Sequence, residues 1–111
     1  MNKQDVLDRV KQIGLLAVIR GPSPDLTVKM VEALVAGGVT GIEITYSTPN
    51  AEDVVRELAQ KFGDKILIGI GTLTKPTQVD TAKSAGATFL VSPVSEPILV
   101  RAMVSSGVLI M

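Results

Sequence analysis

Five short apolar runs divide this chain at regular intervals, and this repeat constrains its fold most strongly. The runs start near residues 15, 40, 66, 88 and 107, so they recur about every 19 to 26 residues. Apolar residues at helical spacing fill the intervals, and glycines or prolines mark most of the joints. Strands that alternate with helices at this spacing predict tight β–α units, a parallel sheet and an α/β fold.

The expected elements follow from apolar periodicity and from capping residues. Ser23 before Pro24 predicts a helix start, and Gly37-Gly38 and Gly86 predict helix ends. We expect strands at residues 15–19, 39–45, 66–70, 88–91 and 108–110. We expect a leading helix at 3–12 and four connecting helices at 25–36, 51–61, 76–85 and 95–105.

Two architectures suit one domain of residues 1–111 with five parallel strands. One is a flavodoxin-like open sheet, which is complete with five strands. The other is about half of a (β/α)8 TIM barrel, whose full length is typically about 200–250 residues. The alternation of strands and helices does not separate these two architectures.

Composition and charge exclude several classes of function. Eleven basic and eleven acidic residues give zero formal net charge, so no overall field attracts nucleic acid or an acidic membrane. The chain has no cysteine and no histidine, which removes disulfides, thiolate chemistry and the commonest ligand of transition metals. No apolar run approaches the roughly 20 residues of a membrane span. The segment after Met1 is charged, unlike a signal peptide, so we expect a cytoplasmic protein.

The hydrophobic content is high for a chain of this length. Hydrophobic residues make up 46% of the chain and the mean hydropathy is +0.39, although small domains bury a smaller share of their surface. We therefore expect a homo-oligomer or a part of a longer protein. If the sheet stays open, we expect one sticky apolar face, formed by Val18, Ile44, Ile68, Val91 and Leu109.

The second apolar run, residues 41–45, carries a carboxylate in its middle. Side chains alternate along a strand, so its two isoleucines face one side, while Glu43 and Thr45 face the other. Because an unpaired buried charge is costly, we expect Glu43 to be a general acid/base whose pKa is raised by desolvation. The alternative is a structural acid that faces solvent or pairs with Arg20.

Other strand ends carry residues that suit a ligand site. Arg20 ends the first run and could hold a carboxylate or a phosphate, or be an ordinary loop arginine. Gly71 allows a ligand to approach the backbone closely, and the Thr72 hydroxyl would point into the site. The alternative is a simple turn in which Gly71 takes a positive φ. Ser92-Pro93 closes the fourth run with a rigid turn.

No lysine is placed for Schiff-base chemistry. A nucleophilic lysine should be desolvated on a strand. Lys65 precedes its strand at the opposite face of the sheet, Lys75 lies in an open loop and Lys83 lies on a helix. None of these three qualifies.

Several motifs together resemble the 2-keto-3-deoxy-6-phosphogluconate (KDPG) aldolase family, in order and spacing along essentially the whole chain. The motifs are Ala17-Val18-Ile19-Arg20, Ala36-Gly37-Gly38-Val39, Ile42-Glu43-Ile44-Thr45 with Thr48-Pro49, Gly69-Ile70-Gly71-Thr72-Leu73, and Ala85-Gly86-Ala87 through Val91-Ser92-Pro93. The resemblance implies a (β/α)8 barrel and a homotrimer. It also implies a class I, Schiff-base aldolase that needs no metal or other cofactor. Family members cleave KDPG to pyruvate and glyceraldehyde 3-phosphate, and some act on 4-hydroxy-2-oxoglutarate.

Transferred by position, the resemblance also implies residue roles. Glu43 resembles the acid/base of the family, Thr72 the residue that contacts the pyruvyl carboxylate, and Pro93 a residue that lines the same pocket. We expect Thr45 and Gly71 to line the substrate site as well. All of these roles concern the keto-acid end of the substrate.

The sequence departs from the family pattern at two places. Many members have an arginine two residues after the motif threonine, where this chain has Ser47; Arg20 on the neighbouring strand is a candidate replacement. The Schiff-base lysine of the family lies on the sixth strand, whereas this sequence stops at the fifth, so we expect the 111-residue chain alone to be inactive. The rival hypothesis is a non-catalytic α/β half-barrel that serves as a scaffold or assembly module.

Overall fold

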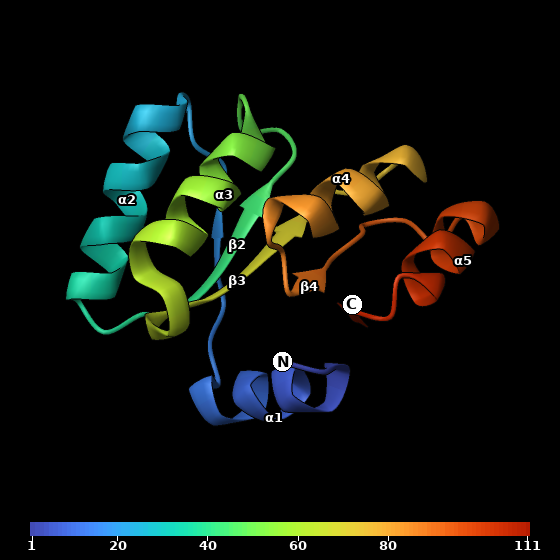
Figure 1. Cartoon of the computed structure of the whole chain (residues 1–111). Coiled ribbons are helices and arrows are strands. Elements are labelled where there is room, and N and C mark those ends of the chain that lie inside the picture. Colours follow the sequence, from blue (N-terminus) through green and yellow to red (C-terminus); the bar gives the residue numbers. More distant parts are fainter.

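Five parallel strands form one sheet in the computed structural model, which describes residues 1–111 (Figure 1). The strands are β1 (Ala17–Ile19), β2 (Gly41–Thr45), β3 (Leu67–Gly71), β4 (Phe89–Leu90) and β5 (Leu109–Ile110). They stand side by side in sequence order, β1-β2-β3-β4-β5. A flavodoxin-like sheet needs the order 2-1-3-4-5, so that alternative is wrong. Successive neighbouring strands are the arrangement that a (β/α)8 barrel uses.

The helices occur where the periodicity predicts them, with small shifts at their ends. They are α1 (Lys3–Ile13), α2 (Pro24–Ala36), α3 (Ala51–Phe62), α4 (Thr77–Ala85) and α5 (Pro97–Ser105), with a 3-10 turn, η1 (Gly63–Lys65), after α3. Ser23 caps α2 as predicted, since its hydroxyl accepts from the Leu26 amide at 3.3 Å. The start of α5 was predicted at Ser95, but the carboxylate of Glu96 caps this helix instead.

The strands are shorter than the apolar runs that predict them. Ladder pairing covers three residues of β1 and two residues each of β4 and β5, although the runs extend further. Leu16 shows the reason: it precedes β1, yet it packs against the cluster under the sheet. Apolar character reports burial, whereas the ladder reports backbone pairing, and the two end at different residues.

Two apolar clusters cover opposite faces of the sheet. Helices α2 to α5 pack on one face, where the larger cluster includes Ile42, Ile44, Ile68 and Ile70. Helix α1 packs alone on the other face, which we call the α1 face; in Figure 1 it lies below the sheet. The small cluster there consists of Val6, Leu67, Phe89 and Leu109. The predicted alternation within residues 41–45 is thereby confirmed.

The prediction of a continuous sticky apolar face is only partly right. Val18 is 53% exposed, as expected for an uncovered strand. Ile44 and Ile68 instead lie under the helix layer, and Leu109 is buried by α1. The prediction placed residues of both faces on one face, because it did not assign the side-chain alternation of each strand.

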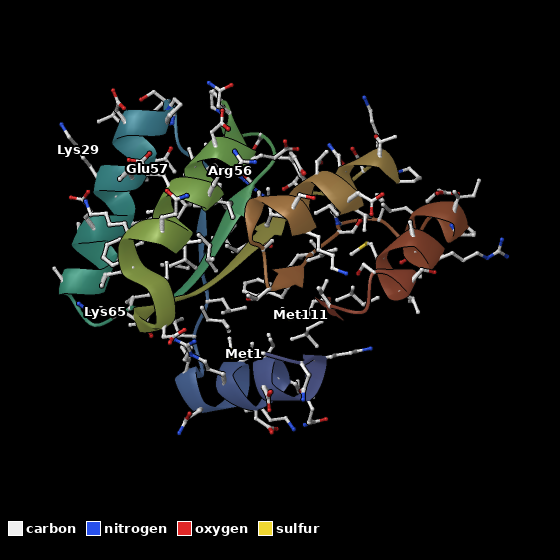
Figure 2. All side chains as sticks on the ribbon, in the orientation of Figure 1. Met1, Lys29, Arg56, Glu57, Lys65 and Met111 are labelled. Atoms are coloured by element: carbon white, nitrogen blue, oxygen red, sulfur yellow. The ribbon has the colours of Figure 1, made fainter.

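Charged side chains gather on the outside of the helix layer. Lys29 on α2 and Arg56 and Glu57 on α3 project away from the sheet (Figure 2). Two ion pairs stand on this outer surface, Arg56 with Asp53 and Lys61 with Glu32. None of the helices combines the length and apolar character that crossing a bilayer requires.

Candidate functional site

Glu43 lies in the middle of β2 on the α1 face of the sheet. It is paired in register with Val18 of β1 and Gly69 of β3, and only 6% of the residue is exposed. A Cβ atom on Gly71 would overlap Oε1 of Glu43, so the carboxylate lies directly against the Gly71 backbone. Gly71 thus leaves the space that this carboxylate occupies, which explains this glycine by close approach, whereas Gly69 leaves space for the ring of Phe89.

No other group of the chain pairs with the Glu43 carboxylate. The chain has two ion pairs and Glu43 takes part in neither, and no side-chain oxygen sealed from solvent lacks a partner. The ion pair with Arg20, one part of the structural alternative, is therefore not formed, and only 6% of Glu43 is exposed. The carboxylate is buried enough to be desolvated, yet its oxygens remain available to a ligand.

The surroundings of Glu43 favour its protonated form. Desolvation raises the pKa of Glu43 above its usual value, and the positive charge of Arg20 opposes this rise. A carboxyl group whose pKa is raised toward neutrality is suited to accept and return a proton. The predicted direction of the shift is confirmed.

Arg20 comes directly after β1, at the carboxyl end of that strand, and its side chain is exposed. The backbone on either side of it is fixed by hydroxyl groups from the last residue of β2 and from the segment after β2. Thr48 Oγ1 accepts a hydrogen bond from the Gly21 amide at 3.0 Å and lies 3.4 Å from the Ile19 carbonyl oxygen. Thr45 Oγ1 lies 3.4 Å from the same carbonyl oxygen. Sequence reasoning did not assign a role to Thr48.

The hydroxyls of Thr45 and Ser47 form a close pair at the end of β2. Their oxygens are 2.6 Å apart, and Thr45 is 1% exposed. Thr45 therefore belongs to the wall of the site more than to its open surface. Ser47 is exposed, and it occupies the position at which many members of the resembled family have an arginine.

Thr72, directly after β3, has an unusual backbone conformation. Its φ is 61°, a left-handed value that is a genuine outlier for a β-branched residue. Such a residue costs of order 1–3 kcal/mol and is often found at functional sites. The turn alternative assigned the positive φ to Gly71, which is wrong, because Thr72 takes it. The half-buried Thr72 side chain makes no hydrogen bond within the chain.

Ser92 ties the end of β4 to the turn that follows Thr72. Its hydroxyl donates to the Leu73 carbonyl at 2.7 Å and accepts from the Val94 amide at 3.1 Å. Pro93 is exposed beside this link. The serine before Pro93 was the available sequence signal, because serine hydroxyls commonly bond to backbone groups two residues away.

No lysine lies on a strand, as predicted. Lys75 is exposed in the loop after β3, and Lys65 is exposed in η1. Lys83 on α4 donates to the Ser106 carbonyl oxygen at 2.7 Å, and Ser106 lies just before the amino-terminal end of β5. No group of three or more acidic side chains is arranged to hold a metal ion.

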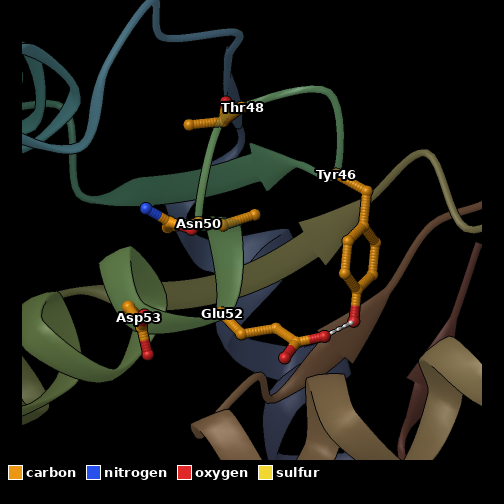
Figure 3. Close-up of a pocket in the computed structure, with 6 residues that line it drawn as sticks. Tyr46, Thr48, Asn50, Glu52 and Asp53 are labelled. Carbon is orange, nitrogen blue, oxygen red and sulfur yellow. Dashed lines mark hydrogen bonds between the residues drawn. The ribbon is translucent and has the colours of Figure 1, made fainter.

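Tyr46 is half-buried and joins the end of β2 to α3 and α4 on the helix side through hydrogen bonds, which sequence reasoning missed. Its hydroxyl lies 2.9 Å from Glu52 Oε1, as Figure 3 shows, and 3.0 Å from the Gln78 carbonyl oxygen. Burial raises the pKa of Tyr46 to about 12; the Thr81 hydroxyl opposes the rise and Glu52 adds to it. Tyr46, Thr48 and Glu52 also line an open pocket of about 270 Å³ (Figure 3). This pocket is separate from the Glu43 carboxylate, since Glu43 is not among its lining residues.

The six predicted site residues thus fall into two groups. Glu43, Thr45 and Gly71 lie within β2 and β3 and are buried. Arg20, Thr72 and Pro93 follow β1, β3 and β4 in the chain, at the carboxyl ends of parallel strands. Carboxyl ends of parallel strands meet at one edge of a sheet, where α/β proteins place their ligands.

Comparison with known proteins identifies the family. The sequence model of the family described as KDPG and KHG aldolase matches residues 6–111. The chain belongs to this aldolase family. Among curated relatives, the 2-dehydro-3-deoxy-6-phosphogalactonate aldolase of Escherichia coli is 33% identical over 86% of this chain and 47% of its own length. The 2-dehydro-3-deoxy-phosphogluconate aldolase of Dickeya dadantii is 45% identical over 65% of this chain and 34% of its own length.

Solved structures of aldolases align with this fold. The Zymomonas mobilis KDPG aldolase, solved with 3-phosphoglycerate, has a TM-score of 0.83 and 26% identity, over 98% of this chain and 51% of that one. The Legionella pneumophila enzyme, with pyruvate captured as a covalent carbinolamine, has a TM-score of 0.74 and 33% identity, over 86% of this chain and 45% of that one. The chain therefore spans about half the length of these solved aldolases, or less.

Proposed function

We propose that this chain forms the pyruvyl-binding half of a class I aldolase, in about half of a (β/α)8 barrel. The reaction is the reversible cleavage of KDPG to pyruvate and glyceraldehyde 3-phosphate. The observation that carries the proposal is the Glu43 carboxylate, which is buried, unpaired and raised in pKa on the face opposite the helix layer. The family to which the chain belongs supports the reaction class.

Glu43 is the proton shuttle in this proposal. A lysine amine forms an iminium with the keto group of the substrate and releases water. Glu43 takes the proton of the C4 hydroxyl, the C3–C4 bond breaks to release the aldehyde, and the bonding electron pair passes into the iminium as an enamine. Glu43 then returns the proton to C3, and hydrolysis releases pyruvate.

The lysine of this mechanism is not among the residues described here. The seven lysines of the chain lie on helices, in η1 or in a loop. The proposal therefore requires a lysine supplied by further polypeptide. The pyruvate carbinolamine reported for the Legionella pneumophila aldolase supports covalent capture as the chemistry of the family.

Arg20 and Thr72 bind the keto-acid end in this proposal. Arg20 brings an exposed cation to the site, which suits a carboxylate. Thr72 offers a hydroxyl that has no partner within the chain. Thr45, Gly71 and Pro93 shape the pocket around them. Thr45 and Gly71 do so as buried walls, and Pro93 as the exposed rim.

The partners in this proposal are a small keto acid and further copies of the protein, as a homotrimer in the cytoplasm. The solved relatives include a porous cage built by fusing symmetric oligomeric domains, which supports an oligomeric aldolase. A non-catalytic half-barrel that serves as an assembly module is the second candidate. The exposed apolar side chains of the first and last units favour that candidate, because they offer surface to another polypeptide.

The test compares two forms of the protein. In a form that carries the nucleophilic lysine, Glu43→Gln should lower kcat by roughly 10²-fold or more, the usual size of a general acid/base effect. Glu57→Gln, on the outer face of α3, is the matched control and should leave kcat unchanged. An equal kcat for Glu43→Gln would return Glu43 to a structural role.

The 111-residue chain by itself tests whether the nucleophilic lysine lies outside these residues. We expect it neither to cleave KDPG nor to trap pyruvate on borohydride reduction, because none of its lysines lies on a strand. A pyruvyl adduct on Lys75 would contradict this expectation. Mass spectrometry after reduction reads out the adduct directly.

A further inference from the structure

We propose that Thr48 is a positioning residue, which holds Arg20 beside Glu43 by fixing the backbone on both sides of the arginine. The proposal deepens the proposed function, on which it rests for its purpose. It concerns a side chain that lies in the loop after β2, outside the set of residues that contact substrate in that function. Three observations carry it.

The first observation is the place of the Thr48 hydroxyl. It accepts from the Gly21 amide at 3.0 Å and reaches the Ile19 carbonyl oxygen at 3.4 Å. One buried hydroxyl therefore bridges the residues immediately before and after Arg20, and Thr48 itself is only 2% exposed. A buried hydrogen bond of this kind is costly to leave unmade, so it fixes the turn.

The second observation is that the Arg20 side chain itself has no partner within the chain. β1 is a three-residue strand at the edge of the sheet, and the Arg20 side chain is exposed. Arg20 takes part in neither of the two ion pairs of the chain. A long, exposed side chain without a partner samples many rotamers. The region that its guanidinium can reach is therefore set by where the backbone of Arg20 is held.

The third observation is the electrostatic effect of Arg20 on Glu43. Arg20 is the one charged group of the chain that acts on the pKa of Glu43, and it lowers that pKa against the effect of burial. No charged group from α1, β3 or β4 adds to this effect. The pKa of Glu43 therefore depends on the distance between its carboxyl group and the Arg20 guanidinium.

Thr45 contributes to the same anchorage to a smaller degree. Its hydroxyl lies 3.4 Å from the Ile19 carbonyl oxygen, but it does not reach the Gly21 amide. It is also engaged with Ser47 at 2.6 Å. Of the two threonines, only Thr48 holds both sides of the arginine, which makes it the residue to test.

The experiment titrates Glu43 in the 111-residue chain by carbon-13 NMR of its carboxyl group. Arg20→Gln should raise the pKa of Glu43, because it removes the positive charge. Thr48→Val, which keeps the shape and loses the hydroxyl, should produce most of the same rise. Thr48→Ser keeps the hydroxyl and should restore the wild-type pKa.

The double variant Arg20→Gln/Thr48→Val decides the mechanism. If Thr48 acts through Arg20, adding Thr48→Val to Arg20→Gln should leave the pKa of Glu43 unchanged. A wild-type pKa in Thr48→Val, or an equal rise in the Arg20→Gln background, would overturn the proposal. Thr48→Ala replaces Thr48→Val in the series if the valine variant does not fold.

This readout does not depend on aldolase activity. If Glu43→Gln leaves kcat unchanged in the lysine-containing form, the proposed function fails, while the pKa series still tests the positioning of Arg20. If the pKa series fails and Glu43→Gln lowers kcat, only the role of Thr48 is lost. The two failures are therefore distinguishable.

Discussion

The two middle β–α units and the two lateral units of this chain differ in how they treat apolar surface. Nine large hydrophobic residues are exposed, and none of them lies between residues 39 and 93, which hold β2, α3, β3 and α4. Apart from Met1, all belong to the first or last units: Leu15, Val18, Leu26, Met30, Val94, Ile98, Val104 and Met111. The middle units bury their large hydrophobic side chains, while the units at both edges of the sheet leave several of theirs exposed.

The middle units therefore carry the proposed site, and the lateral units carry the surfaces that could bind another polypeptide. The middle units hold Glu43, Gly71 and Thr72, which are the centre of the proposed site. The lateral units hold unpaired strand edges and apolar helix surface, which are features that invite another polypeptide. Arg20 is the exception, because it stands on the edge strand and acts on the centre. The comparison predicts different responses to substitution in the two regions.

The largest expected difference is in core truncation. Leu58 on α3 is fully buried, so Leu58→Ala should lower the free energy of unfolding by about 2–5 kcal/mol. Ile98 on α5 is 62% exposed, so Ile98→Ala should change the free energy by about 0.5 kcal/mol or less. Urea unfolding followed by circular dichroism measures both. Equal losses would mean that the Ile98 face is covered in solution.

The next effect sharpens the comparison within β3. A methyl group on Gly69 would overlap the ring of Phe89, which is fully buried, so Gly69→Ala should cost about 1–3 kcal/mol. A methyl group on Gly71 meets the end of the Glu43 side chain, which can rotate away. Gly71→Ala should therefore cost less stability and should move the Glu43 carboxylate. Thermal unfolding of the two variants gives the ranking, and a larger loss for Gly71→Ala would contradict it.

The third effect concerns the edges. We expect the 111-residue chain to self-associate, and Val18→Lys with Ile98→Lys should weaken that association by about tenfold or more. Burying one such side chain is worth about 1.5–3 kcal/mol, and about 1.4 kcal/mol corresponds to tenfold. Gln60→Lys, on the exposed side of α3, is the matched control. A monodisperse wild-type monomer in light scattering would show that the open edges are tolerated.

The smallest effect is the pH dependence of stability that Glu43 contributes. Its pKa is raised in the folded state, so the folded state binds more protons and this contribution to stability is fully present below the unfolded pKa. The contribution is lost as the pH rises through the folded pKa. Relative to wild type, Glu43→Gln should therefore be more stable near neutral pH than near pH 4. Urea unfolding across this range measures the difference, and a constant difference would show that the pKa is not raised.

The sequence predicted the order of the elements and the face on which Glu43 lies. Both follow from local rules, since periodicity assigns strands and helices and alternation assigns faces. Its single wrong face assignment, which grouped Ile44 and Ile68 with Val18, came from treating strands of different phase as one surface. The flavodoxin-like alternative could only be removed by the strand order, which is a long-range property.

The parts of the site that sequence reasoning missed depend on contacts between distant segments. Thr48 meets the Gly21 amide across 27 residues, and the Tyr46 hydroxyl meets the Gln78 carbonyl across 32 residues. Nothing in the local pattern around either residue indicates these partners. The positive φ of Thr72 was missed for a different reason, because propensity assigns such angles to glycine and Gly71 stood next to it.

Tyr46 gives the molecule a single optical reporter. It is the one tyrosine and the chain has no tryptophan, so fluorescence and near-ultraviolet absorbance come mainly from the joint between β2, α3 and α4. Fraying of the lateral units would therefore leave this signal unchanged, while backbone probes would record it. Because the pKa of Tyr46 is about 12, appearance of the phenolate band at a lower pH would mark opening of the middle units. Each tyrosine spectrum of this chain therefore measures one place in the molecule.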